Sequence, residues 1–117
     1  MSNLASSVRN RFEILREIGF ASISGSYSGV GLPFLNPIRI LHFVNETDVS
    51  LYVSMNGVDN HVVVPGNSFA LYDLTANRAS AGGILEQPQG DRVYVKAKSG
   101  LPTLGDFSVI ATYASQV

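Results

Sequence analysis

The chain has 117 residues, of which 45% are hydrophobic and 15% charged, with a net charge of −1 and no cysteine. One domain of this length can bury a core without metals or disulfides. The absence of cysteine excludes a disulfide framework, a thiolate zinc site and a cysteine nucleophile. The balanced charge excludes an electrostatic field that would attract nucleic acid or an anionic membrane.

The charge-poor composition has two explanations. Either some surface is buried against partner proteins, or the chain forms a β-sandwich whose outer faces are rich in Ser, Thr and Asn. The N-terminus has no basic run followed by an apolar core, and no apolar run approaches the roughly 18 residues of a membrane span. We therefore expect a protein that is made in the cytoplasm, without a signal peptide or a membrane segment.

The first predicted element is an amphipathic helix of about four turns at residues 3–18, within an N-terminal helical segment 1–19. Its apolar residues recur at steps of three and four, and the charged Glu13 and Arg16 are expected to face solvent. The apolar stripe either packs on the sheet of its own chain or docks on a neighbouring subunit. It consists of Leu4, Val8, Phe12, Leu15 and Ile18.

Residues 20–37 are expected to form an extended arm that contains glycine and proline, within which 20–27 form either a weak edge strand or part of the arm. Each proline favours extended or turn backbone in the residue before it, so the segment from Ser28 to Pro37 is predicted to be an irregular connector. The apolar residues Leu32, Phe34 and Leu35 of this arm need cover, either under the edge of the domain or in a partner.

Residues 38–117 alternate apolar and polar side chains in short runs, with turn signals about every 8–12 residues. This pattern predicts a mainly β fold, an antiparallel β-sandwich or jelly roll of about seven or eight strands. The run at 38–44 is apolar on both alternating sets, so we expect it to be covered on both faces. The expected strands are 38–44, 49–55, 61–64, 68–74, a short one near 84–85, 92–98 and 107–114. The residues expected to make the turns are Asn45, Asp48, Asn56, Gly57, Pro65, Gly66 and Asn77.

No cluster of residues has the composition of a catalytic, cofactor or metal centre. His42 lies within an apolar strand and His61 follows a turn, and no carboxylate is spaced to complete a metal site, so both are expected to be structural. The carboxylates lie near predicted turns, where they bond local backbone. We expect no enzyme activity, no cofactor and no metal, since a hydrolase would require two carboxylate-bearing loops to converge.

A possible row of tyrosines is the remaining candidate for binding. Tyr52, Tyr72 and Tyr94 are expected on outer strand faces. There they either cover strand neighbours or a subunit interface, or stack on sugars or bases as a carbohydrate-binding or receptor-binding module would.

Five segments, taken in order, resemble small structural proteins of tailed bacteriophage virions. They are NETD at 45–48, SMNGVDNHVVVP at 54–65, YDLTAN at 72–77, GDRVYVK at 90–96 and LPTLGDFSV at 101–109. The resemblance covers about residues 36–113, and the N-terminal 35 residues fall outside it. Asn56 stands where an aspartate is expected, and Leu104 lies inside the Pro-Thr-x-Gly loop; neither change alters the turns.

The resemblance implies a non-enzymatic β-sandwich subunit of the virion, made in the cytoplasm of a bacterial host. It would form a collar or head-to-tail ring at the neck, or alternatively decorate the capsid as a cement protein. The implied partners are copies of the chain itself and a portal, connector or major capsid protein. No nucleic acid and no membrane partner is implied.

Overall fold

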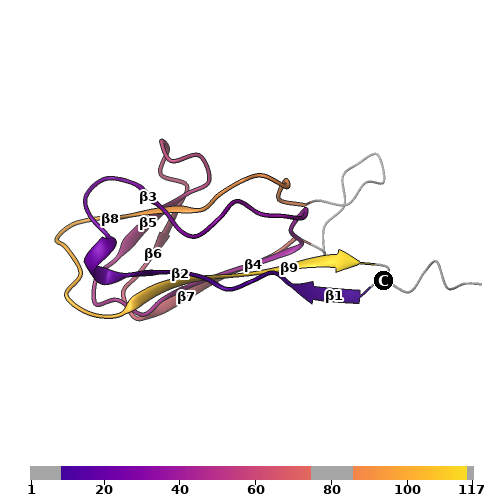
Figure 1. Cartoon of the computed structure of the whole chain (residues 1–117). Coiled ribbons are helices and arrows are strands. Elements are labelled where there is room, and N and C mark those ends of the chain that lie inside the picture. The colour runs from indigo at the N-terminus through magenta and orange to yellow at the C-terminus, as the bar shows by residue number, and fades with distance from the viewer. Residues whose placement is uncertain (1–8, 75–85, 116–117) are drawn as a thin grey trace, which may run out of the picture.

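The structure is a computed structural model, and it describes residues 9–74 and 86–115. Two antiparallel sheets make up this part of the chain (Figure 1). One is a five-stranded sheet in the order β1-β9-β4-β7, with β2 also paired to β9, and the other is a four-stranded sheet in the order β3-β8-β5-β6. The strands are β1 (Arg9–Phe12), β2 (Arg16–Gly19), β3 (Ser28–Gly29), β4 (Ile40–Asn45), β5 (Leu51–Ser54), β6 (Val62–Val64), β7 (Ser68–Asp73), β8 (Tyr94–Ala97) and β9 (Asp106–Ser115). The prediction of a mainly β, antiparallel chain is confirmed.

The two sheets enclose one apolar core. Along β4 the side chains alternate, so that Leu41 and Phe43 are buried while His42 between them is half-buried on the opposite side. Phe43 stacks on Phe107 of β9 with ring centroids 6.0 Å apart. Val53 in the four-stranded sheet is fully buried and belongs to the same core cluster. β4 is therefore central, as its apolar sequence predicts, but its outer side chains are not fully covered.

The N-terminal helix is not observed, which corrects the sequence prediction. Residues 9–12 and 16–19 are instead the short strands β1 and β2, which pair with successive halves of the ten-residue β9. The only helical turn at this end of the described chain is the short 3-10 helix η2 (Phe20–Ser22). Leu4 and Val8 lie outside the described residues.

The reason for this difference is tertiary. An amphipathic helix gains most of its stability by burying its apolar face, yet Phe12 and Leu15 are 72% and 52% exposed here. Backbone hydrogen bonds to the long β9 replace those of a helix, and Glu13 and Arg16 occupy the buried positions instead. Ile18 alone of the described stripe packs against the core, where it is partly buried.

The segment 20–37 runs along the sheets and contributes to the core. Ile23, Val30 and Phe34 are buried within the main cluster. Backbone hydrogen bonds attach the segment to the chain entering β8: the Val30 amide donates to the Val93 carbonyl at 2.8 Å, and the Phe34 amide donates to the Asp91 carbonyl at 2.8 Å. Of the three apolar residues expected to need cover, Phe34 is buried, while Leu32 and Leu35 are 68% and 65% exposed.

A buried asparagine organises the turn between β4 and β5. Asn45 is 1% exposed, and its amide donates to the carbonyls of Val49, Val64 and Pro65 at 2.9, 3.0 and 3.1 Å. Its side-chain oxygen accepts a hydrogen bond from the Thr47 amide at 2.9 Å. One side chain therefore joins the β4–β5 turn to the end of β6.

Side chains also brace the turn between β5 and β6. Gly57 has φ +77°, the left-handed conformation that the Asn-Gly sequence predicts. The Ser54 hydroxyl accepts from the Gly57 amide at 2.9 Å and donates to the Asn56 side chain at 2.9 Å. His61 Nδ1 accepts from the Met55 amide at 3.0 Å, so this histidine braces the turn.

Two further turns are fixed by a side-chain hydrogen bond and by a left-handed backbone conformation. Asp48 accepts from the Thr103 amide at 2.9 Å, and hydrogen bonds from Thr103 hold the pKa of Asp48 below its usual value. After Pro65 and Gly66 the chain turns into β7 through Asn67, whose φ is +54°. The expected turn residue Asn77 and the short strand near 84–85 lie outside the described residues.

Candidate functional site

An exposed apolar surface covers the outer side of the five-stranded sheet. The strand register places His42 between Ile110 of β9 and Leu71 of β7, and places Val44 beside Phe69. We call this surface the outer apolar face; it comprises Ile40, His42, Val44, Phe69, Leu71 and Ile110. Its most prominent side chains, Phe69 and Leu71, are 63% and 55% exposed. Large contiguous apolar surfaces are uncommon on monomers, which makes this face a candidate for contact with another protein.

Two features shape the outer apolar face. His42 meets Phe69 edge-on, with ring centroids 5.4 Å apart, so the histidine here packs against an aromatic ring. At the end of the sheet where β4 and β7 meet, an open hollow of about 400 Å³ adjoins Phe69. It is lined by Val44, Asn45, Glu46, Asn67, Ser68 and Phe69. This hollow is wide and open, which suits contact with another protein surface better than enclosure of a small molecule.

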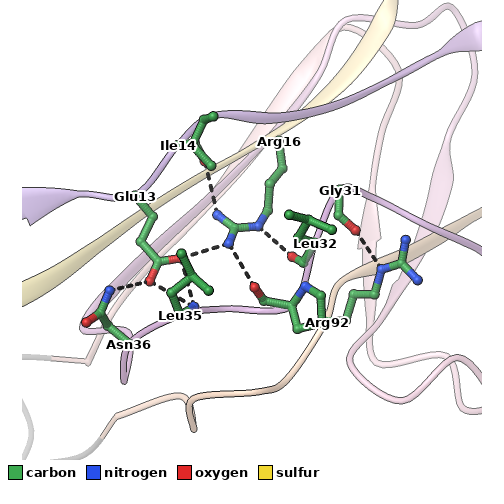
Figure 2. Close-up of polar contacts among 9 residues, drawn as sticks. Glu13, Ile14, Arg16, Gly31, Leu32, Leu35, Asn36 and Arg92 are labelled. Carbon is green, nitrogen blue, oxygen red and sulfur yellow. Dashed lines mark hydrogen bonds and ion pairs between the residues drawn. The ribbon is translucent and has the colours of Figure 1, made fainter.

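A buried ion pair lies beneath the opposite edge of the same sheet (Figure 2). Arg16 Nη2 is 2.8 Å from Glu13 Oε1, and both side chains are almost fully buried. The guanidinium also donates to the carbonyls of Ile14, Leu32 and Pro33 at 3.0, 2.8 and 3.1 Å. Arg16 therefore connects the backbone of residue 14 to that of residues 32 and 33.

The Glu13 carboxylate also accepts hydrogen bonds from residues 35 and 36. It accepts from the Asn36 amide at 2.8 Å and from the Leu35 backbone amide at 3.1 Å (Figure 2). Burial raises the pKa of Glu13, but the hydrogen bonds from Asn36 and Leu35 and the neighbouring Arg16 outweigh it and hold the pKa below its ordinary value. The lowered pKa favours the ionised carboxylate, and its hydrogen bonds to Asn36, Leu35 and Arg16 make the pair a structural clamp.

The clamp fixes the loop that carries two exposed leucines. Arg16 lies over the Phe34 ring, 5.0 Å from its centroid, and Arg92 Nε donates to the Gly31 carbonyl at 2.6 Å. Leu32 and Leu35 project from this loop into solvent. The sequence predicts that Glu13 and Arg16 lie at the surface; their spacing of three residues and their opposite charges indicate the pair, but not its burial.

The outer side of the four-stranded sheet has a different chemistry, with tyrosines and lysines in contact. Lys96 Nζ lies 4.7 Å from the centroid of the Tyr27 ring and 5.7 Å from that of Tyr52, and Lys98 Nζ lies 5.9 Å from that of Tyr52. Burial raises the pKa of Tyr27, with smaller contributions from Tyr52 and Asp59. We call this group, Tyr27, Tyr52, Lys96 and Lys98, the tyrosine–lysine cluster. Tyr52 is predictable from strand alternation, whereas Tyr27 lies in the segment expected to be an arm, where no such pattern indicates its neighbours.

The three predicted tyrosines do not form one row. Tyr94 lies in the same sheet as Tyr52 with Arg92 5.7 Å from its ring centroid, whereas Tyr72 lies on β7 of the other sheet, against Phe43. Tyr72 lines a small apolar cavity of about 150 Å³ between the sheets. The cavity is bounded by Leu41, Phe43, Met55, Val62, Tyr72, Leu74 and Gln87.

Within residues 9–74 and 86–115, no group of three or more His, Asp or Glu side chains is arranged to hold a metal ion. His42 lies in β4 of the five-stranded sheet, whereas His61 lies in the turn before β6 and bonds the Met55 amide. The same described residues include no helix long and apolar enough to cross a membrane. Among the described residues, the outer apolar face is the surface on which exposed apolar side chains from neighbouring strands lie side by side.

A scan against protein-family models gives no match, and a search of curated proteins finds no relative of the chain.

Proposed function

We propose that this chain is a non-enzymatic structural subunit of a tailed-phage virion, with a β-sandwich fold, that assembles with copies of itself into a collar or head-to-tail ring at the neck. The observation that carries the proposal is the outer apolar face, where Phe69 and Leu71 are 63% and 55% exposed. Burying such side chains against another subunit removes apolar area from water, which drives association.

Three further observations support a structural role. Charged residues make up 15% of the chain, and the buried Glu13–Arg16 pair removes two of them from the surface. The ordered turn motifs resemble those of phage virion proteins, and two of their residues, Asp48 and Thr103, are hydrogen-bonded to each other. Side-chain hydrogen bonds at the turns favour a rigid scaffold, which suits a subunit that must present fixed contact surfaces.

The test is the oligomeric state of the purified chain. Mass photometry and light scattering are expected to show a closed homo-oligomer, or a complex when the chain is mixed with a portal, connector or major capsid protein. Binding to the portal or connector favours the neck, and binding to capsid alone favours the alternative of a decoration protein. A chain that remains monomeric and joins none of the three would refute the proposal.

The tyrosine–lysine cluster favours a second candidate, a carbohydrate-binding or receptor-binding module. Tyrosine rings stack on sugar faces, and Lys96 and Lys98 would favour acidic sugars. Binding on a glycan array that is lost on Tyr52→Ala would support this candidate. The matched control is Tyr72→Ala, because Tyr72 lies on the other sheet.

A further inference from the structure

In the described part of the five-stranded sheet, β1 and β7 are edge strands, and both carry large exposed apolar side chains. In the order β1-β9-β4-β7, the strands β1 and β7 each pair with one neighbour among the described strands and lie at opposite ends of the sheet. β7 is six residues long, with Phe69, Leu71 and Tyr72 63%, 55% and 41% exposed. Every residue of β1 is exposed, including Phe12 at 72%. Large exposed apolar side chains therefore lie on both edge strands.

Soluble proteins usually protect such an edge from pairing with another chain. Common means are a very short edge strand, a lysine or proline within it, or a β-bulge. The four-stranded sheet uses the first, because its outermost strands β3 and β6 have two and three residues. β7, with the sequence SFALYD, is longer and contains no lysine or proline. An edge of this length and apolar content is a template for strand addition.

We propose that the edge strand β7 of one subunit pairs with the edge strand β1 of a second copy of this chain, so that the five-stranded sheet continues across the subunit boundary. The inference rests on the self-assembly in the proposed function and names the surfaces that carry it. A ring requires two different surfaces on each subunit, and the two opposite edges of one sheet supply them. β1 lies along the end of β9 (Figure 1), and the sheet order places it on the opposite side of β9 from β4.

The side chains on the two strands favour this pairing over pairing of β1 with itself. β1 carries Arg9 and Arg11 within four residues, so two copies of β1 side by side would place like charges together. β7 carries no basic residue and ends in Asp73. The register within the subunit places Phe12 on the same side of the sheet as the outer apolar face. Pairing would thus extend that face with an aromatic side chain from the neighbour.

Because the chain has no cysteine, introduced thiols report the contact directly. Asn10→Cys places a thiol on β1, and Leu71→Cys places one on β7, both on the outer side of the sheet. With a short thiol-specific crosslinker, a mixture of the two single variants is expected to give covalent dimers, and the double variant a ladder of higher oligomers. Crosslinking of Leu71→Cys with itself would overturn the assignment of β1 as the partner strand, because it reports a two-fold β7–β7 contact.

A charge placed on the edge tests the same contact without labels. Leu71→Lys is expected to lower the association constant at least about tenfold, because lysine on an edge strand opposes pairing. The matched control is Val63→Lys on β6, where an apolar side chain 43% exposed on the edge of the other sheet is changed in the same way. It is expected to change association less than about twofold. Thermal unfolding of both variants checks that each remains folded.

The outcomes separate the two proposals. If the unmodified chain assembles, but Leu71→Lys and Val63→Lys assemble equally well and the thiol pair does not crosslink, the strand pairing is wrong and the structural function stands. If the unmodified chain is monomeric alone and with portal, connector and capsid proteins, both are wrong.

Discussion

The buried pair Glu13–Arg16 offers the sharpest test of the fold at the N-terminal end. Arg16→Met keeps much of the side-chain volume but removes the charge, leaving the Glu13 carboxylate buried without its cation. Breaking a buried pair by removing one partner typically costs about 3–5 kcal/mol. The full range applies here because both side chains are almost completely buried and the guanidinium also donates to three backbone carbonyls.

The assay is urea unfolding at equilibrium, followed by circular dichroism. Arg16→Met is expected to lower the free energy of unfolding by about 3–5 kcal/mol. The double variant Glu13→Gln, Arg16→Met is expected to lose less free energy of unfolding than the two single variants lose in sum. With both changes made, no buried charge is left without its partner. Arg9→Met, on the exposed strand β1, is the control and is expected to change stability by no more than about 0.5 kcal/mol.

The pH dependence gives an independent readout of the same pair. The folded pKa of Glu13 lies below its ordinary value of 4.5, so its ionised form stabilises the fold above that pH. This contribution is lost as the pH falls through the folded pKa. Without Arg16 the pKa of Glu13 is less depressed, so Arg16→Met is expected to lose less stability than the parent chain as the pH falls.

An N-terminal helix with both charges in solvent predicts a different result. An exposed pair at this spacing is worth about 0.3–0.5 kcal/mol, so Arg16→Met would then resemble the Arg9→Met control. Equal unfolding curves for these two variants, with unchanged acid dependence, would refute the strand assignment and the buried clamp together.

Three further predictions concern the turns. Gly105→Ala is expected to destabilise the fold by more than about 1 kcal/mol, measured by urea unfolding, because φ is +87° and a Cβ would overlap the Glu46 carbonyl oxygen. Asn45→Ala is expected to cost about 1–3 kcal/mol in the same assay, since it removes the hydrogen bonds that the buried Asn45 amide donates to the Val64 and Pro65 carbonyls. Thr103→Val is expected to raise the pKa of Asp48 in an NMR titration, because the hydroxyl hydrogen bond that favours the ionised carboxylate is lost.

The sequence predicts those elements whose structure is set by local chemistry. Strand alternation locates β5, β7, β8 and β9 to within a few residues, because side chains on successive residues point to opposite sides of a strand. Turn residues such as Gly57 are predictable because a positive φ limits the choice of amino acid. His61 is likewise found where a turn needs a hydrogen-bond acceptor.

The sequence does not predict elements that depend on distant partners. The helical spacing of Phe12, Leu15 and Ile18 is real, but pairing with β9 about 90 to 100 residues later decides the backbone of this segment. The burial of Arg16 depends on carbonyls of residues 32 and 33, which no local pattern connects to it. Likewise Tyr27 and Lys96 meet only because β3 pairs with β8.

The two outer sheet surfaces differ in a way that bears on assembly. On the four-stranded sheet, Lys96 and Lys98 cover tyrosine rings, and the edge strands are short, so this side is suited to remain in water. On the five-stranded sheet, Phe69 and Leu71 are exposed on β7, which pairs with one neighbour among the described strands. A subunit with one surface adapted to solvent and the other to protein contact has a defined orientation within an assembly. Contacts between copies through the five-stranded sheet would leave the tyrosine–lysine cluster accessible to solvent.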